Sequence, residues 1–309
     1  MTTTSIPPSG PASTPTPRLG TTAYASAAAR AAHLEVDAAP HLLVDDLAAR
    51  LLGDAGAGFL GYQRAYRTEP VMATARLWAV ARSRVAEDLL AASSARQYVV
   101  LGAGLDTSAL RLAAPSGRVA FEVDLPAASA AKRVALALAG VTLPDALSLV
   151  AADLRDPDWP LALVDAGLDP TVPTFVACLG VTMYLSADDV RGLALGVASL
   201  APGSELVLDH VLPAEHRDEV GEAYAQGVAA VAGQAGEPWR YQAAPEEMAA
   251  LLTEAGLGVV RAVDLADAVA PLLRDRADAL SPVRIAGVAH ARVPDLPAPG
   301  VRPAISSAR

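Results

Sequence analysis

The sequence has few of the residue types that build metal and disulfide sites. Its one cysteine, Cys178, excludes an internal disulfide and any metal site made of thiolates. Because Cys178 lies inside an apolar run, we expect a buried, unreactive thiol. Four histidines show no metal-ligand spacing and are interpreted as surface or packing residues: His33, His41, His216 and His290. We therefore expect no metal.

Positive charge and long apolar runs are also scarce. The chain has 24 basic against 34 acidic residues, a net charge of −10 and a single lysine, Lys132. Since neutralisation of phosphates drives nucleic-acid binding, an acidic chain without a basic run predicts no nucleic-acid partner and no anionic membrane surface. No run of 18 or more residues resembles a membrane span, and no secretory signal opens the chain, so we expect a cytoplasmic protein.

Aromatic residues make up only 4% of the chain, whereas alanine supplies 69 of its 309 residues. The core must then consist of small side chains, Leu and Val between closely packed helices. Proline-rich ends predict a disordered arm over 1–20 and a flexible tail over 294–309. We expect a single domain over 21–293, with a helical extension over 21–92 and an α/β core over 97–292.

Apolar spacing in the extension predicts helices over 22–36, 43–53 and 71–92. A glycine cluster predicts a loop between the last two: Gly53, Gly56, Gly58 and Gly61. From Gln97 onward, apolar runs alternate with helical segments, and strands are expected over 98–101, 119–124, 147–150, 174–179, 205–210, 257–263 and 285–292. Further helices are expected from the second strand to about 139 and over 187–200, 214–236 and 245–255, and Pro157 and Pro160 predict a loop.

The alternation predicts an α/β fold, a mostly parallel sheet with helices on both faces. Ligands of such sheets bind beyond the carboxyl ends of the strands. The segment 214–236 stands outside the alternation. We interpret it as part of a helical cap inserted over about 214–243.

Two motifs at predicted strand ends indicate a nucleoside ligand. Gly102 and Gly104 would let the backbone approach a ligand closely, although a plain strand-to-helix turn uses the same residues. The third glycine of a dinucleotide fingerprint is replaced by Thr107. Glu122 and Asp124 end the second strand, where a carboxylate either accepts both ribose hydroxyl hydrogens or is simply solvated. These motifs do not separate a nicotinamide cofactor from S-adenosylmethionine.

The third strand leads into Asp153 and Leu154. In methyltransferase folds an acid at this place accepts the adenine amino group, and a neighbouring apolar side chain covers the ring. Taken together, the motifs resemble the leucine carboxyl methyltransferase family and its bacterial relatives. The matching segments are 81–84, 99–107, 110–112, 121–126, 152–156 and 183–185. The resemblance covers about 21–292 and implies a class I methyltransferase (Rossmann-like) fold.

The resemblance also implies a site for S-adenosylmethionine. Arg82 would pair with the carboxylate of the methionine moiety. Asp124 would hold the ribose, with Glu122 close by. The other matched residues would line the methionine, namely Gly102 and Gly104, or hold and cover the adenine, namely Asp153 and Leu154.

Two positions depart from the family. The family carries a glutamate directly before the position of Gly180, where this chain has Leu179, so an apolar wall replaces a carboxylate at the cofactor. Loss of one charged hydrogen bond would cost about 1.5–3 kcal/mol of affinity. Eukaryotic members also bring a lysine from the N-terminal segment, and here that role is vacant or taken by Arg30.

His210 and Tyr184 are the candidate catalytic residues. His210 ends the fifth strand at the ligand edge and is the best candidate for a general base, which a hydroxyl acceptor would use and an ionised carboxylate would not. A structural histidine at the strand end explains it equally well. Asp209 points to the opposite face of the strand, so we expect no dyad with His210. Tyr184 would contact cofactor or substrate, or only pack.

These features predict an S-adenosylmethionine-dependent O-methyltransferase acting on a carboxylate or hydroxyl of a small molecule. The high Ala and Arg content suggests a G+C-rich genome, where this family is associated with secondary metabolism. The apolar Leu179 also leaves an alternative function open. The protein would keep the methyltransferase fold but no longer methylate, and would act as a cyclase or scaffold that uses the same pocket. Thr107 and the lack of a Tyr-x-x-x-Lys pair weigh against a nicotinamide-dependent oxidoreductase. Ala-rich helices over 22–36 and 214–236 offer a homo-oligomer face, although core packing or a lid explains them too.

Overall fold

The computed structural model describes residues 17, 19–113 and 116–295. The arm expected over 1–20 and the tail expected over 294–309 lie outside the described residues, apart from 17, 19, 20, 294 and 295. Leu19 is buried against the first helices. Leu19 therefore already belongs to the packed part of the chain, two residues before the predicted boundary at residue 21.

Seven strands form one sheet in the order β3-β2-β1-β4-β5-β7-β6. The strands are β1 Gln97–Leu101, β2 Val119–Asp124, β3 Leu147–Ala151, β4 Thr174–Cys178, β5 Glu205–Val211, β6 Gly258–Asp264 and β7 Ala286–Arg292. The first five strands run parallel to one another, and β7 runs antiparallel to both β5 and β6. The predicted mostly parallel sheet is confirmed.

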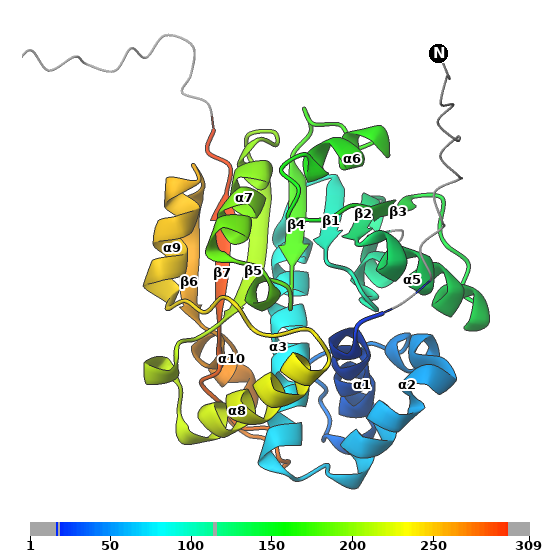
Figure 1. Cartoon of the computed structure of the whole chain (residues 1–309), viewed down its shortest axis with the longest axis vertical. Helices are drawn as coiled ribbons and strands as arrows, with labels where there is room; N and C mark the ends of the chain where they lie inside the picture. The colour runs from blue at the N-terminus through cyan, green and yellow to red at the C-terminus, as the bar shows by residue number, and fades with distance from the viewer. Residues whose placement is uncertain (1–16, 18, 114–115, 296–309) are drawn as a thin grey trace, which may run out of the picture.

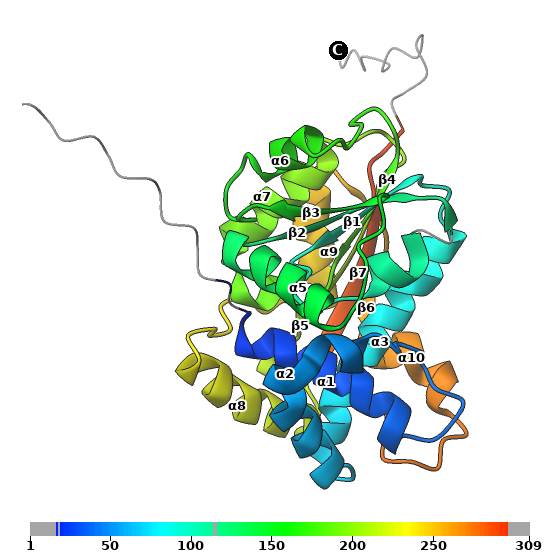
Figure 2. The same ribbon diagram turned by 90° about the vertical axis from the view of Figure 1, so that its right-hand side faces the viewer.

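Helices cover both faces of this sheet and its carboxyl edge (Figures 1 and 2). They are α1 Thr21–Val36, α2 Ala48–Ala65, α3 Pro70–Ala92, α5 Pro126–Leu138, α6 Trp159–Asp165, α7 Ala187–Ala198, α8 Glu219–Gln234, α9 Pro245–Glu254 and α10 Leu265–Leu273. Short helical turns are η1 Ala109–Ala113, η2 Thr182–Tyr184 and η3 Ala214–His216. One core lies between the sheet and α3 and α10, and a second between the sheet and α6, α7 and α9.

The strand register brings the predicted motifs together. Leu101 lies opposite Val123 on one side and Cys178 on the other. The turn after β1 therefore lies between the ends of β2 and β4. In Figure 1 these strand ends point towards α1, α2 and α8, which lie across the edge of the sheet.

The predicted glycine loop after residue 53 is wrong. Gly53 has a φ of 50° and kinks α2, but the helix continues through the other glycines to Ala65. It continues because Leu51, Leu52 and Leu60 pack against α1, and this burial outweighs the low helix propensity of glycine.

Two other helices were not predicted. The loop expected around Pro160 is α6, because proline is tolerated in the first turn of a helix, and Trp159 and Leu163 are buried on its inner face. In α10, the side chain of Asp264 accepts a hydrogen bond from the N–H of Ala266 at 2.8 Å, a capping signal that the sequence does contain. Within the described part of the chain, no helix combines the length and apolar character needed to cross a bilayer.

Candidate active site

A cavity of about 1310 Å³ lies between the carboxyl ends of the strands and the helices across them. We divide its lining into two parts. The strand-end half comprises lining residues from the turns after β1 to β4, together with Arg82 of α3, whose guanidinium lies against Gly180: Gly102 to Asp106, Asp124, Leu125, Ala152 to Arg155, Leu179 to Val181 and Met183 to Leu185. The helical half comprises the lining residues from α2, α8, the segment after α8 and the start of α1, together with those from α3 other than Arg82.

Asp124 and the glycine turn form the centre of the strand-end half. Gly102 and Gly104 have φ values of 66° and 46°, which favour glycine. The N–H of Gly104 donates to Asp124 Oδ2 at 2.6 Å, and the N–H of Leu125 donates to Oδ1 at 2.8 Å. Burial raises the pKa of Asp124, and these two hydrogen bonds oppose the rise. The turn thus fixes a carboxylate at the cavity wall.

Arg82 is fixed at the cavity by a residue that the sequence analysis set aside. Asp209 is fully buried at the end of β5, and its carboxylate accepts from Arg82 Nη1 at 3.1 Å and from Trp78 Nε1 at 2.8 Å. It also accepts from the N–H of Gly180 at 2.6 Å. A Cβ at Gly180 would lie 2.7 Å from Arg82 Nη2, so only glycine leaves room for the guanidinium. The sequence did contain an indication of this role, since an acidic side chain in a central apolar strand needs a partner for its charge.

The position of Asp209 also bears on Leu179, which replaces the glutamate expected from the family. Leu179 lines the cavity as an apolar residue, as expected. A carboxylate is nevertheless present beside it, because Asp209 binds the backbone of Gly180 from the neighbouring strand. The carboxylate is buried behind the cavity wall and acts through Arg82 and the turn.

Asp153 and Leu154 both line the cavity beyond β3. Leu154 is buried, and Asp153 is half-buried. Arg155 donates from Nε to Asp153 Oδ1 at 2.9 Å, and this interaction lowers the pKa of Asp153. An ionised acceptor backed by a guanidinium therefore lies at the predicted adenine position.

Glu122 and Arg30 have structural partners. Glu122 is buried below the cavity lining and forms an ion pair with Lys132 at 2.5 Å. Burial raises the pKa of Glu122 to about 7, and Lys132 opposes the rise. Arg30 lines the cavity, but it donates to Asp45 Oδ2 at 2.8 Å and to the Leu105 carbonyl at 2.7 Å. Glu122 therefore lies beneath the residues that line the cavity and does not line the cavity itself.

The two candidate catalytic residues lie in different places. Tyr184 lines the cavity, and burial raises the pKa of its hydroxyl. His210 is fully buried outside the cavity lining, where Nδ1 lies 2.9 Å from the Ala243 carbonyl and the ring contacts Gly287. Burial lowers the pKa of His210. Asp209 and His210 face opposite sides of β5 as predicted, and the side that faces the cavity turns out to be that of Asp209.

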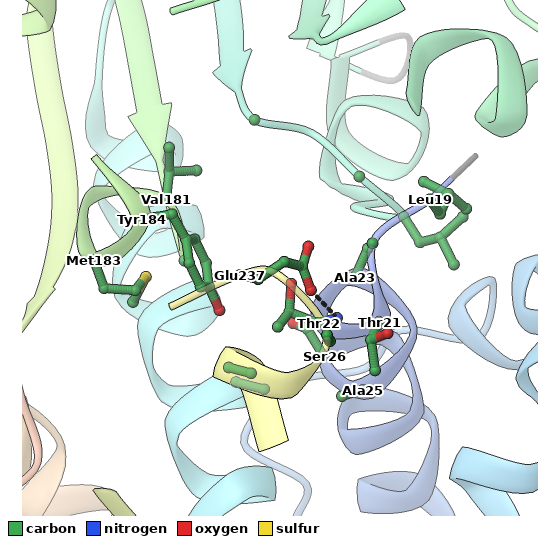
Figure 3. Close-up of a pocket in the computed structure, with 18 of the residues that line it drawn as sticks. Leu19, Thr21, Thr22, Ala23, Ala25, Ser26, Val181, Met183, Tyr184 and Glu237 are labelled. Atoms are coloured by element: carbon green, nitrogen blue, oxygen red, sulfur yellow. Dashed lines mark hydrogen bonds between the residues drawn. The ribbon is translucent and has the colours of Figure 1, made fainter. Parts of the chain in front are cut away.

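The helical half contains residues that the sequence analysis did not single out. Trp78 lies edge-on to Tyr224 at 5.9 Å and to Trp239 at 6.0 Å between ring centroids. Glu237 follows α8 and accepts a hydrogen bond from the N–H of Thr22 at 3.2 Å (Figure 3). In Figure 3 the hydroxyl of Tyr184 points towards this contact. The cavity is lined by six aromatic side chains, in a chain that has only three Trp, seven Tyr and three Phe: Phe59, Tyr62, Trp78, Tyr184, Tyr224 and Trp239.

The remaining reactive groups lie away from the cavity. Cys178 is buried, and burial raises the pKa of its thiol, in agreement with an unreactive residue. Among the residues described, no three metal-ligating side chains come together in one group.

Comparison with known proteins gives a consistent result. The family model for leucine carboxyl methyltransferase matches residues 23–198. A relative from Mycolicibacterium smegmatis, provisionally named an S-adenosyl-L-methionine-dependent methyltransferase, is 43% identical over 140 residues, which are 44% of this chain and 46% of the relative. A relative of the same name from Mycolicibacterium gilvum is 36% identical over 207 residues, 62% of this chain and 67% of its own. The chain thus spans about half the length of most of the curated relatives that it matches.

Solved structures agree on the fold. A protein from Thermobifida fusca, provisionally named a methyltransferase, has a TM-score of 0.56 at 23% identity, covering 80% of this chain and 92% of its own. A DUF574 family protein from Streptomyces avermitilis has a TM-score of 0.54 at 22% identity, covering 86% and 97%. These likenesses confirm the predicted class I methyltransferase fold.

Proposed function

Because this chain belongs to the leucine carboxyl methyltransferase family, we propose that it is an S-adenosylmethionine-dependent O-methyltransferase acting on a small molecule. One observation carries the proposal. The Asp124 carboxylate is fixed at the cavity wall by the Gly104 N–H at 2.6 Å, between the glycine turn and Asp153. A carboxylate in this position suits a ribose with two free hydroxyls.

The lining residues fit the rest of the cofactor. Arg82 has its guanidinium at the cavity and is the cation that would pair with the methionine carboxylate. Leu154 would cover the adenine, and Asp153 would accept from its amino group. When bound, S-adenosylmethionine supplies a methyl group on a positively charged sulfur.

The contribution of the chain is to bind, orient and exclude water. Methyl transfer requires the nucleophile to lie in line with the departing sulfur, and such positioning can supply roughly 7–11 kcal/mol of the barrier. The rigid turns after β1 and β4 would fix one reactant. The helices across the strand ends, with their aromatic side chains, would hold the other and close the cavity over both.

The alternative of a fold that no longer methylates rested on Leu179. That reason is weakened, because Asp209 supplies a carboxylate to the backbone of Gly180 and holds Arg82 in place. The family match does not favour the alternative either.

The proposal is tested by calorimetric titration with S-adenosylmethionine and S-adenosylhomocysteine. We expect micromolar binding that Asp124→Ala weakens by about 100-fold, since it removes two charge-assisted hydrogen bonds to ribose of about 1.5 kcal/mol each. Asp188→Ala is the matched control, because Asp188 is an exposed acid on α7 away from the cavity. No binding by the unmodified protein would overturn the proposal.

A further inference from the structure

The helical half of the cavity contains one carboxylate and one polar hydrogen that lacks an acceptor. Glu237 uses Oε2 to accept from the N–H of Thr22 at 3.2 Å, and among the described residues nothing donates to its Oε1. The indole Nε1 of Trp239 is buried beside the Tyr184 hydroxyl and makes no hydrogen bond of normal geometry within the described residues. Both residues line the cavity and lie close to the Tyr184 hydroxyl.

The positive groups at the cavity are almost all engaged. Arg82 is paired with Asp209 and also donates to Ser26 at 3.0 Å. Arg30 is paired with Asp45, and Arg155 with Asp153. The fourth lining arginine, Arg240, is an exposed residue, and an exposed charge is screened by solvent. The helical half therefore offers a carboxylate substrate a like charge and little compensation.

A hydroxyl matches these groups better than a carboxylate does. A hydroxyl both donates and accepts, whereas an ionised carboxylate only accepts. Its hydrogen could go to Glu237, and its oxygen could accept from the Trp239 N–H, which the Tyr184 hydroxyl alone does not satisfy with normal geometry. The walls around these groups are apolar and aromatic, with Trp78 and Tyr224 buried and Met72 and Val228 partly buried. Such walls suit a flat, largely apolar molecule.

We propose that the methyl acceptor is a hydroxyl on an aromatic, largely apolar molecule, with Glu237 as the proton acceptor and Trp239 as the hydrogen-bond donor to the acceptor oxygen. This inference rests on the proposed function and selects between its two acceptor groups. It gives the role of general base to Glu237, because His210 lies outside the cavity.

The reaction step balances without any further reactant. The hydroxyl proton passes to the Glu237 carboxylate as a lone pair of the acceptor oxygen forms a bond to the methyl carbon. The bond from that carbon to sulfur breaks, and its electron pair remains on sulfur. The products are a methyl ether and S-adenosylhomocysteine, and the proton on Glu237 is released to solvent.

A pair of ring-matched probes tests the inference by binding alone. The full chain is titrated calorimetrically with 2-naphthol and with 2-naphthoate, in the presence and in the absence of S-adenosylhomocysteine. We expect 2-naphthol to bind at least about tenfold more tightly than 2-naphthoate, because only the carboxylate meets the charge of Glu237. In Glu237→Gln, which keeps an oxygen for the Thr22 N–H, the two affinities should differ by less than about threefold.

The control variant is Glu215→Gln, since Glu215 is exposed and outside the cavity lining. It should keep the ratio of the unmodified protein. Equal or tighter binding of 2-naphthoate, a ratio that Glu237→Gln leaves unchanged, or no binding of either probe overturns the inference. Failure of S-adenosylhomocysteine alone to bind overturns the proposed function instead, and the probe ratio is then taken from the free protein.

Discussion

The strand-end half of the cavity holds its charged side chains with several hydrogen bonds each, whereas the helical half holds its one carboxylate with a single bond. Asp124 accepts from two backbone N–H groups, and Arg82 is fixed by Asp209 and Ser26. Glu237 accepts only from the N–H of Thr22 among the described residues. The first half is prearranged for one fixed ligand. The second half is built of small residues and of aromatic side chains such as Trp78, Tyr224 and Trp239, which project from helices and from the segment after α8.

The difference follows from how each half is assembled. Parallel strands bring their carboxyl ends to one edge, so short motifs far apart in sequence meet there whatever the helices do. The helical half depends on α1, α2, α3 and α8 packing against one another across that edge. Its shape is thus the part of the cavity that can change between relatives while the cofactor site stays the same.

The largest predicted effect tests whether the strand-end half is as rigid as we argue. Asp209→Ala leaves Arg82, Trp78 and the Gly180 N–H without their shared acceptor in a fully buried position. Removal of one partner from a buried ion pair costs about 3–5 kcal/mol of unfolding free energy. Urea denaturation measures the loss, and calorimetry with S-adenosylhomocysteine should show weaker binding as Arg82 moves.

The double variant Arg82→Ala/Asp209→Ala sharpens this test. With both charges removed, the loss of stability should be smaller than the sum of the two single losses. If Asp209→Ala alone lost less than about 1 kcal/mol, the ion pair would not anchor this half, since such a loss is typical of exposed pairs.

The sequence predicted the strand-end half well, because its motifs are local. Gly102, Gly104, Asp124 and Asp153 each follow a predicted strand, and the register of the sheet then places them together. The sequence did not predict Asp209, whose partners Trp78 and Arg82 come from a helix more than 120 residues earlier.

The sequence left the role of His210 open for a related reason. Alternation along β5 predicts that Asp209 and His210 face opposite ways, but every residue of β5 is buried, so the pattern cannot tell which side faces the cavity. Glu237 and Trp239 were missed for a further reason. They lie in the cap region, where no strand fixes the position of a side chain and only packing against α1 and α3 decides it.

A second prediction concerns the charge buried beneath the strand-end half. The folded protein raises the pKa of Glu122 from 4.5 to about 7, so between these values it binds more protons than the unfolded chain. The stabilisation is present below pH 4.5 and is lost as the pH rises through about 7. We expect the unfolding free energy to fall by about 1–3 kcal/mol more between pH 5 and pH 8 than it does in Glu122→Gln.

Urea denaturation at several pH values measures the two curves. Glu122→Gln also leaves Lys132 without its carboxylate, which lowers the whole curve, so the comparison uses the change with pH and not the absolute stability. Parallel curves would show that Glu122 is ionised in the fold throughout, and that the ion pair with Lys132 outweighs the cost of burial.

The third prediction separates a packing residue from a base. His210→Gln should lower the unfolding free energy by about 1 kcal/mol, because the hydrogen bond to the Ala243 carbonyl is weakened. The affinities for S-adenosylhomocysteine and for 2-naphthol should stay within about twofold, since a change below 0.5 kcal/mol is expected at a distance from both ligands. Calorimetry and denaturation on the same sample measure both. If ligand affinity fell while the unfolding free energy stayed the same, His210 would have to be counted among the residues that act on the ligands.

The smallest effect tests the helical half alone. Trp239→Phe keeps an aromatic ring against Trp78 but removes the N–H that has no acceptor within the described chain. The free protein should be as stable as before or slightly more so, because a buried donor without a partner is costly. The affinity for 2-naphthol should fall by about three- to tenfold, the value of one neutral hydrogen bond, while S-adenosylhomocysteine binds as tightly as before. If both affinities fell together, the two halves of the cavity would be coupled through the cap. Binding of the cofactor would then depend on the helical half, and the helices could not determine the choice of acceptor independently of the cofactor site.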